Sequence, residues 1–194
     1  MAHSSCIELS AEEKQQLLDI ARQSIRSGLD YGHASTPDET QFSGNLLASF
    51  GTFVTLKQLG ELRGCMGCLQ STDALVKSVA NSAFNAAFRD PRFARLQAEE
   101  VGQTRLDISV LSQMEPMTVE NREDLFNQLK PGADGLLLED SGYRSTFLPK
   151  VWDDLKSPQA FLEHLLLKAG LTPEHWSKTL RFSRYHAVNF DGKL

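Results

Sequence analysis

Residues 50–69 read FGTFVTLKQLGELRGCMGCL, and this stretch decides the fold. Residues 50–56 are rich in β-branched and aromatic side chains, so they predict a strand, and residues 62–69 predict a second one. The connection between them, Lys57-Gln58-Leu59-Gly60-Glu61, is short and contains a glycine, which is typical of a hairpin. The stretch therefore predicts two neighbouring antiparallel strands.

A helix is predicted before this hairpin. Ser10 and Glu13 have the spacing of a capping box, and an apolar stripe with helical periodicity follows them. Gly28 is expected to stop this helix. Residues 30–44 are rich in Gly, Ser, Thr and Pro, which predicts an irregular surface loop. The stripe consists of Leu17, Leu18, Ala21 and Ile25.

A second helix is predicted after the hairpin. Ser71 or Thr72 is expected to cap it, with Asp73 in the first turn. The helix is expected to end before Pro91, because the residue preceding a proline disfavours helical geometry. Its alanine-rich stripe predicts close packing against a sheet or another helix. The stripe consists of Leu75, Val76, Val79, Ala80, Ala83, Phe84 and Ala87.

The remaining sequence mixes short strands with short helices. This pattern predicts an α+β fold with a mainly antiparallel or mixed sheet flanked by helices, in a single domain over residues 1–194. The expected elements are a strand at 106–110, a helix at 121–129, strands at 135–138 and 143–148 joined by a hairpin, a helix opened by Ser157-Pro158 and ended by Gly170, a short helix from Thr172-Pro173 containing Trp176, and a final strand over 179–190.

Composition narrows the classes of function. The 194 residues carry a formal net charge of -5, which argues against sequence-independent binding of nucleic acid. The first residues lack the basic start and apolar run of a signal peptide, and no apolar stretch approaches the roughly 20 residues that cross a bilayer. Three cysteines suggest no disulfide framework. We therefore expect a cytoplasmic protein without membrane or nucleic-acid partners, and no cofactor motif is present.

The chemically notable segment is Arg63-Gly64-Cys65-Met66-Gly67. Two glycines inside a strand mark a bulge or a close approach of backbone or ligand. In a regular strand, Arg63 and Cys65 would share one face roughly 7 Å apart. A guanidinium at that range could favour a thiolate, so Cys65 is a candidate nucleophile and Arg63 its partner. The alternative is a packed thiol with glycines that serve tight packing.

Two other patterns leave alternatives open. Cys65 and Cys68 form a C-x-x-C, which is typical of a redox pair or half a zinc site, but their spacing favours opposite strand faces and Cys6 is the only other cysteine. Asp90-Pro91-Arg92-Phe93 could fix a turn through a local ion pair or could present Arg92 to an anionic ligand. We therefore take Gly64, Gly67, Asp90, Arg92 and Phe93 as candidate binding residues.

The chain resembles the AMMECR family over nearly its whole length. Residues 51–56 and 62–67 carry its signature, and two small departures are Met66 in place of isoleucine and Cys68 in place of threonine or serine. Five further blocks match in order. They are Asp90-Pro91-Arg92-Phe93, Ile108-Ser109-Val110-Leu111, Pro131-Gly132-Ala133-Asp134-Gly135, Thr146-Phe147-Leu148-Pro149-Lys150-Val151-Trp152 and Lys168-Ala169-Gly170-Leu171.

The resemblance implies a larger lobe of sheet and helices, a smaller second lobe and a cleft. It also implies a role beside a Memo-like protein and a radical SAM protein in the AmmeMemoRadiSam system, with the Arg-Gly-Cys motif as the functional feature. No reaction comes with the family. Three hypotheses remain: a non-catalytic or substrate-presenting component, an enzyme or covalent carrier that uses Cys65 with Arg63, and metal handling through Cys65 and Cys68. No general base can be named from spacing, although His164 is available.

Overall fold

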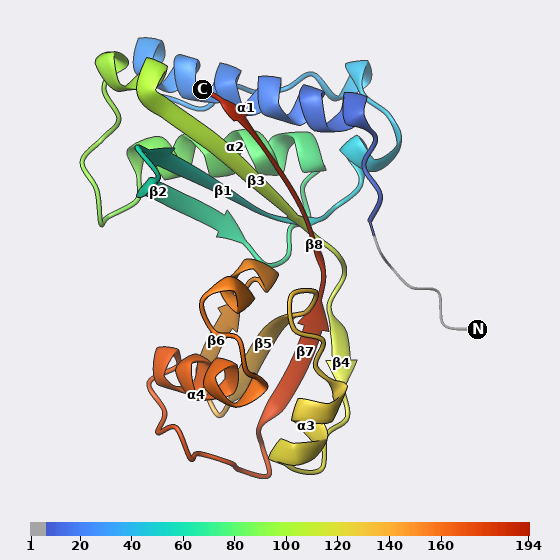
Figure 1. Cartoon of the computed structure of the whole chain (residues 1–194). Coiled ribbons are helices and arrows are strands. Elements are labelled where there is room, and N and C mark those ends of the chain that lie inside the picture. Colours follow the sequence, from blue (N-terminus) through green and yellow to red (C-terminus); the bar gives the residue numbers. More distant parts are fainter. Residues whose placement is uncertain (1–6) are drawn as a thin grey trace. The chain divides into compact units, whose positions relative to one another are not determined.

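The computed structural model describes residues 7–194, and the chain divides into two compact units (Figure 1). The first unit runs to Leu111 and resumes with Val188–Leu194, and the second is Ser112–Ala187. Each unit contains one four-stranded sheet with helices, and every strand pair whose register is defined is antiparallel. The predicted α+β class is therefore confirmed. The single-domain assignment and the cleft stay predictions.

The first unit has the sheet order β2-β1-β3-β8. Helices α1 and α2 lie together on one face of this sheet (Figure 1). The elements are α1 (Ala11–Tyr31), the 3-10 turns η1 (Glu39–Gln41), η2 (Gly44–Leu47) and η3 (Ala98–Gln103), β1 (Gly51–Gln58), β2 (Glu61–Cys68), α2 (Leu75–Phe88), β3 (Thr104–Leu111) and β8 (Ala187–Lys193).

The predicted hairpin is confirmed as β1 and β2. Leu59 and Gly60 form its turn with φ angles of 51° and 88°, and positive φ at both positions is the signature of a type I′ turn. The register then slips by one residue, because Leu56 pairs with Gly64 while Lys57 pairs with Leu62. Arg63 is therefore the extra residue of a β-bulge, which places an irregularity inside the Arg-Gly-Cys motif.

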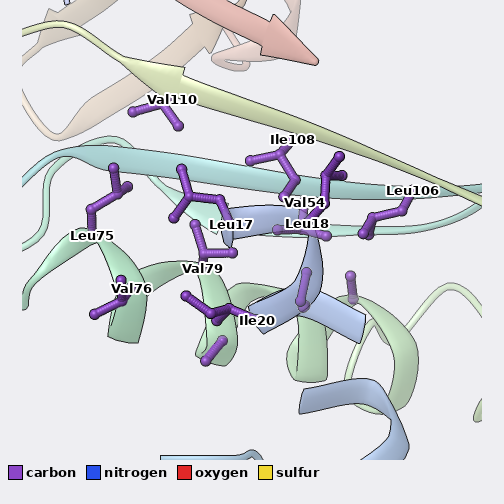
Figure 2. Packing of buried hydrophobic residues seen from close by; sticks show 14 of the residues in the cluster. Leu17, Leu18, Ile20, Val54, Leu75, Val76, Val79, Leu106, Ile108 and Val110 are labelled. Atoms are coloured by element: carbon purple, nitrogen blue, oxygen red, sulfur yellow. The ribbon is translucent and has the colours of Figure 1, made fainter. Parts of the chain in front are cut away.

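The core of the first unit lies between the two helices and the sheet. Figure 2 shows Leu17, Leu18 and Ile20 of α1 meeting apolar residues of α2, β1 and β3. Alternation along β3 sends Leu106, Ile108 and Val110 into this core, as their spacing predicts. The sheet face turned away from the helices carries the intervening polar residues.

The first helix begins as predicted but ends later. Ser10 and Glu13 form the capping box, which is confirmed. The expected stop at Gly28 is wrong, because the helix continues to Tyr31 and ends at Gly32 with a φ of 78°. Gly28 instead lies on the buried side, where a Cβ atom would come within 2.1 Å of Cε2 of Phe88. The glycine at position 28 therefore admits a neighbouring ring and does not end the helix.

The second helix begins later than predicted. Its N-cap is Ala74, so the expected cap at Ser71 or Thr72 is wrong. The hydroxyl of Ser71 accepts a hydrogen bond from the backbone of Asp73 within the preceding turn. The backbone N–H of Leu75, one of the groups that a helix start leaves without an intrahelical partner, donates to the carbonyl of Ala48 at 2.9 Å.

The second unit has the sheet order β4-β7-β5-β6. The predicted hairpin between β5 and β6 is confirmed, with positive φ at Ser141 and Gly142, and Ser157 caps α4 as expected. The core contains Trp152 stacked on Phe161 with ring centroids 3.9 Å apart. The elements are β4 (Glu115–Met117), α3 (Arg122–Gln128), β5 (Gly135–Asp140), β6 (Tyr143–Phe147), η4 (Pro149–Asp153), α4 (Pro158–Lys168) and β7 (Arg181–Tyr185).

Two predictions fail in this part of the chain. Residues 171–180 contain no helix, because side chains from this segment bind Asp140 at the β5–β6 turn: His175 at 2.6 Å, Ser177 at 2.7 Å and Thr179 at 2.5 Å. The expected single strand over 179–190 is two strands, β7 and β8, which belong to different sheets and are separated by His186.

Candidate functional site

The site is built around Cys65 on β2, which is an edge strand. Cys65 pairs with Thr55 of β1, and the Thr55 hydroxyl donates a hydrogen bond to the Cys65 sulfur at 3.2 Å. The side chain of Thr55 is buried, whereas Cys65 is half-buried. The thiol is thus free, it belongs to a half-buried residue, and the neighbouring strand holds it through the hydrogen bond from Thr55.

Asp90 and Arg92 cover the outer edge of β2 at Cys65. The Cys65 N–H donates to Oδ2 of Asp90 at 2.9 Å, and Nη2 of Arg92 donates to the Cys65 carbonyl oxygen at 3.3 Å. Arg92 also binds both oxygens of Asp90, at 2.9 and 2.6 Å. The ion pair expected in Asp90-Pro91-Arg92-Phe93 is therefore present, and it occupies both edge-facing backbone groups of Cys65.

Asp90 serves this arrangement as a permanent anion. The hydrogen bonds from the Arg92 guanidinium hold the pKa of Asp90 well below its usual 3.8, although burial acts in the opposite direction. The Cys65 N–H contributes to the same lowering of the pKa. A carboxyl group so stabilised in its charged form is a poor general acid or base near neutral pH.

Arg63 points its guanidinium at a different partner. Its Nε and Nη2 donate to the two oxygens of Glu100 at 2.8 and 3.0 Å, and Nη1 donates to the carbonyl of Ala94 at 2.9 Å. These bonds from Arg63 lower the pKa of Glu100 to about 2. The predicted action of Arg63 on the thiol stays a prediction. The cation that contacts Cys65 is Arg92, through the Cys65 carbonyl oxygen, and the hydrogen bonds to Asp90 raise the pKa of Arg92.

The two glycines of the motif allow close backbone contacts, which the sequence predicts. A Cβ atom on Gly64 would lie 2.2 Å from the carbonyl oxygen of Ala86 in α2, and one on Gly67 would lie 2.0 Å from the carbonyl oxygen of Thr52. Phe93 is half-buried under the Arg92 guanidinium, 5.4 Å from the ring centroid. The binding roles proposed for these residues stay predictions.

The second thiol lies elsewhere. Cys68 contacts Ser78 of α2, with the sulfur 3.9 Å from the hydroxyl, so it belongs to the helix-covered face and not to the face of Cys65. Cys6 lies outside the described residues. Within residues 7–194, no group of three or more His, Cys, Asp or Glu side chains is placed to hold a metal ion. His164 lies on α4 in the second unit.

Sequence reasoning missed two residues of this site, Thr55 and Glu100. The hairpin signals that a residue of β1 faces Cys65, but regular pairing from the Leu59-Gly60 turn would make that residue Val54, and the bulge at Arg63 shifts the partner to Thr55. Glu100 carries no such signal, because it follows an irregular segment whose path depends on tertiary contacts.

In the part of the chain that is described, no helix is long and apolar enough to cross a membrane.

Fold and site together define a two-unit α+β protein with a free thiol on a capped edge strand. Comparison with known families places it more closely: the AMMECR1 model matches residues 18–190, and the chain belongs to this family. A protein of Saccharolobus islandicus strain L.S.2.15 is 33% identical over 94% of this chain and 83% of its own length. A Methanothermobacter thermautotrophicus protein is 32% identical over 94% of this chain and 95% of its own length. The crystal structure of an uncharacterised Pyrococcus horikoshii protein superposes with a TM-score of 0.86 at 28% identity, covering 95% of this chain and 94% of that one.

Proposed function

We propose that this protein is a non-catalytic component that binds or presents a substrate to a partner protein through the surface around Cys65. One observation carries the proposal. Among the described residues, the only hydrogen bond to the Cys65 sulfur comes from Thr55, and the nearby charged groups are committed to each other as Asp90–Arg92 and Arg63–Glu100. A nucleophilic cysteine needs a base within hydrogen-bond reach or an activating cation, and in these pairs the carboxylates are bound to arginines and each arginine charge is offset by a carboxylate.

The expected partners follow from the family resemblance. A Memo-like protein and a radical SAM protein are the proteins with which this chain would act. The rigid edge of β2 supports a contact of this kind, because Asp90 and Arg92 fix the backbone on which the thiol is displayed. A surface held in place before binding loses less conformational entropy when the partner docks.

Co-purification tests the proposal directly. Each partner would be co-expressed with the wild-type chain, with Cys65→Ser, with Arg92→Gln and with the control Cys68→Ser, whose sulfur lies on the other face of the sheet. We expect a complex with the wild type and the control, and a weaker one with Arg92→Gln. Failure to detect any complex, including by chemical crosslinking, would contradict the proposal.

The second candidate function is covalent chemistry at Cys65, and the hydrogen bond from Thr55 to its sulfur favours it. Here Cys65 acts as a thiolate nucleophile or carrier, and Arg63 is its predicted cation. Site-resolved alkylation of Cys65 across pH, in the wild type, Arg63→Gln and Arg92→Gln, separates the two functions. Rapid alkylation at neutral pH that slows in Arg63→Gln supports the covalent function. Alkylation only after unfolding excludes it.

Metal handling through Cys65 and Cys68 is the weakest alternative, because the two thiols lie on opposite faces of β2. Metal analysis of protein purified without oxygen tests it. Absence of both bound metal and metal uptake would remove it.

A further inference from the structure

Two exposed arginines beside the capped edge lack an acidic partner. Residues 89–95 contain Arg89, Arg92 and Arg95 but only one acid, Asp90, and this acid is bound to Arg92. Within the described chain, neither Arg89 nor Arg95 forms an ion pair. Two unneutralised cations in a chain of net charge -5 form a local positive surface.

Aromatic rings hold these two guanidinium groups. Arg89 lies over Phe84, 5.1 Å from the ring centroid, and Arg95 lies over Phe88 at 5.8 Å. The two rings are themselves neighbours, with centroids 5.1 Å apart. Cation–π contacts orient the guanidinium planes while their N–H groups stay exposed. The pair is thus pre-ordered, and its hydrogen-bonding edge remains available to an anion.

An open groove adjoins Arg95. It has a volume of about 330 Å³, and its walls include Leu29, Phe88 and Leu96, with the polar Gln97 beside Arg95. Gly32 lines the same groove and would meet nothing within 4 Å if it carried a Cβ atom. The groove therefore combines a few apolar side chains with a mostly polar exposed surface and has the cation of Arg95 at its rim, and it has room for a side chain that lies next to a negative charge.

We propose that Arg89, Arg95 and this groove bind an acidic peptide segment of a partner protein, with an apolar side chain in the groove. The two cations lie over neighbouring aromatic rings, which suits carboxylates spaced along an extended chain. Arginine pairs with such carboxylates by two parallel hydrogen bonds. This inference rests on the proposed function only in that a partner protein exists, and it does not depend on the Cys65 thiol.

Selection from a display library of random twelve-residue peptides tests this inference. We expect enriched peptides to carry Asp or Glu beside a large apolar residue. The best synthetic peptide should bind the wild type less tightly as salt increases. The double variant Arg89→Gln/Arg95→Gln should bind it about tenfold more weakly, since two charged contacts are lost. Leu29→Glu should also weaken binding, because it places a like charge in the groove.

The matched control is Arg105→Gln/Arg144→Gln, which removes the same charge from arginines paired with Asp191 and Glu139. It should keep wild-type affinity, as should Cys65→Ser, and thermal unfolding checks that every variant is folded. The inference would be overturned if the selected peptides were not enriched in Asp or Glu. It would also be overturned if both double variants lost the same amount of peptide affinity. Displacement of the peptide by millimolar inorganic phosphate would instead assign a small-anion site and would also overturn it. If Cys65→Ser still binds the peptide, the peptide site does not depend on the Cys65 surface. A failure of the proposed function at that surface would then leave this inference intact.

Discussion

The carboxylate of Asp90 takes the place of a neighbouring strand for Cys65. Its Oδ2 accepts the Cys65 N–H at 2.9 Å, and Arg92 supplies a donor for the Cys65 carbonyl. An uncovered edge strand is open to pairing with other chains, and proteins commonly block such edges with charged groups. The Asp90–Arg92 pair therefore blocks the edge of β2 at Cys65 and leaves the thiol free.

Asp90→Ala should lower the free energy of unfolding by about 2 kcal/mol, because it leaves the Cys65 N–H without its acceptor and Arg92 without its partner. Urea unfolding measures the change. The control Asp19→Ala breaks the pair with Arg22 at a carboxylate that is 62% exposed and should cost less than about 0.5 kcal/mol. Equal costs for the two variants would show that the edge cap contributes nothing.

Glu100 should make stability depend on acid pH. Its pKa falls from 4.5 to about 2 on folding, so its contribution is complete above pH 4.5 and is lost as the pH decreases toward 2. Glu100→Gln should therefore be less stable than the wild type at pH 6, with a difference that shrinks as the pH approaches 2. Urea unfolding across this range measures it. A difference that does not change with pH would contradict the ion pair with Arg63.

Gly64→Ala should destabilise the first unit, because the new methyl group would lie 2.2 Å from a backbone carbonyl of α2. We expect a loss of about 2 kcal/mol, which corresponds to a decrease in Tm of roughly 4–8 °C. Gly102→Ala is the control, since a Cβ atom there meets nothing within 4 Å. Unchanged melting of Gly64→Ala would mean that β2 and α2 can separate at no cost.

Leu59→Asn should stabilise the protein. Leu59 has a φ of 51° and is 93% exposed, so it bears left-handed strain without burying its side chain. Asn-Gly suits a type I′ turn, and we expect a gain of about 0.5 kcal/mol by thermal unfolding. Leu167→Asn, at an exposed leucine inside α4, should bring no gain. A decrease in Tm for Leu59→Asn would show that the leucine stabilises the turn by a contact of its own.

The sequence predicted turns and helix caps correctly where the interactions that form them join residues close together in the chain. The turns at Leu59-Gly60 and Ser141-Gly142, the capping box at Ser10 and the cap at Ser157 all direct the chain through neighbouring atoms. The failures involve distant partners. Gly28 makes room for Phe88, sixty residues away in the chain, and the segment 171–180 is held by Asp140 and not by its own helical hydrogen bonds.

The sequence predicted several residues of the candidate site but fewer of the contacts between them. The motif pointed to Arg63 and Cys65, and the Asp90–Arg92 pair was expected as one alternative. Regular alternation would place Arg63 beside Cys65, but the bulge at Arg63 breaks that alternation and Glu100 binds the guanidinium. A bulge and a partner 37 residues distant leave no periodic signal in the sequence.

The order of synthesis sets a constraint on how this protein matures. Strand β8 lies next to β3 in one sheet, yet the 76 residues of Ser112–Ala187 come between the two parts of the first unit. A ribosome therefore releases the whole second unit before β3 can gain its partner. Contacts so distant in sequence form slowly. During translation β3 remains an open edge, and the second unit can fold before the first is complete.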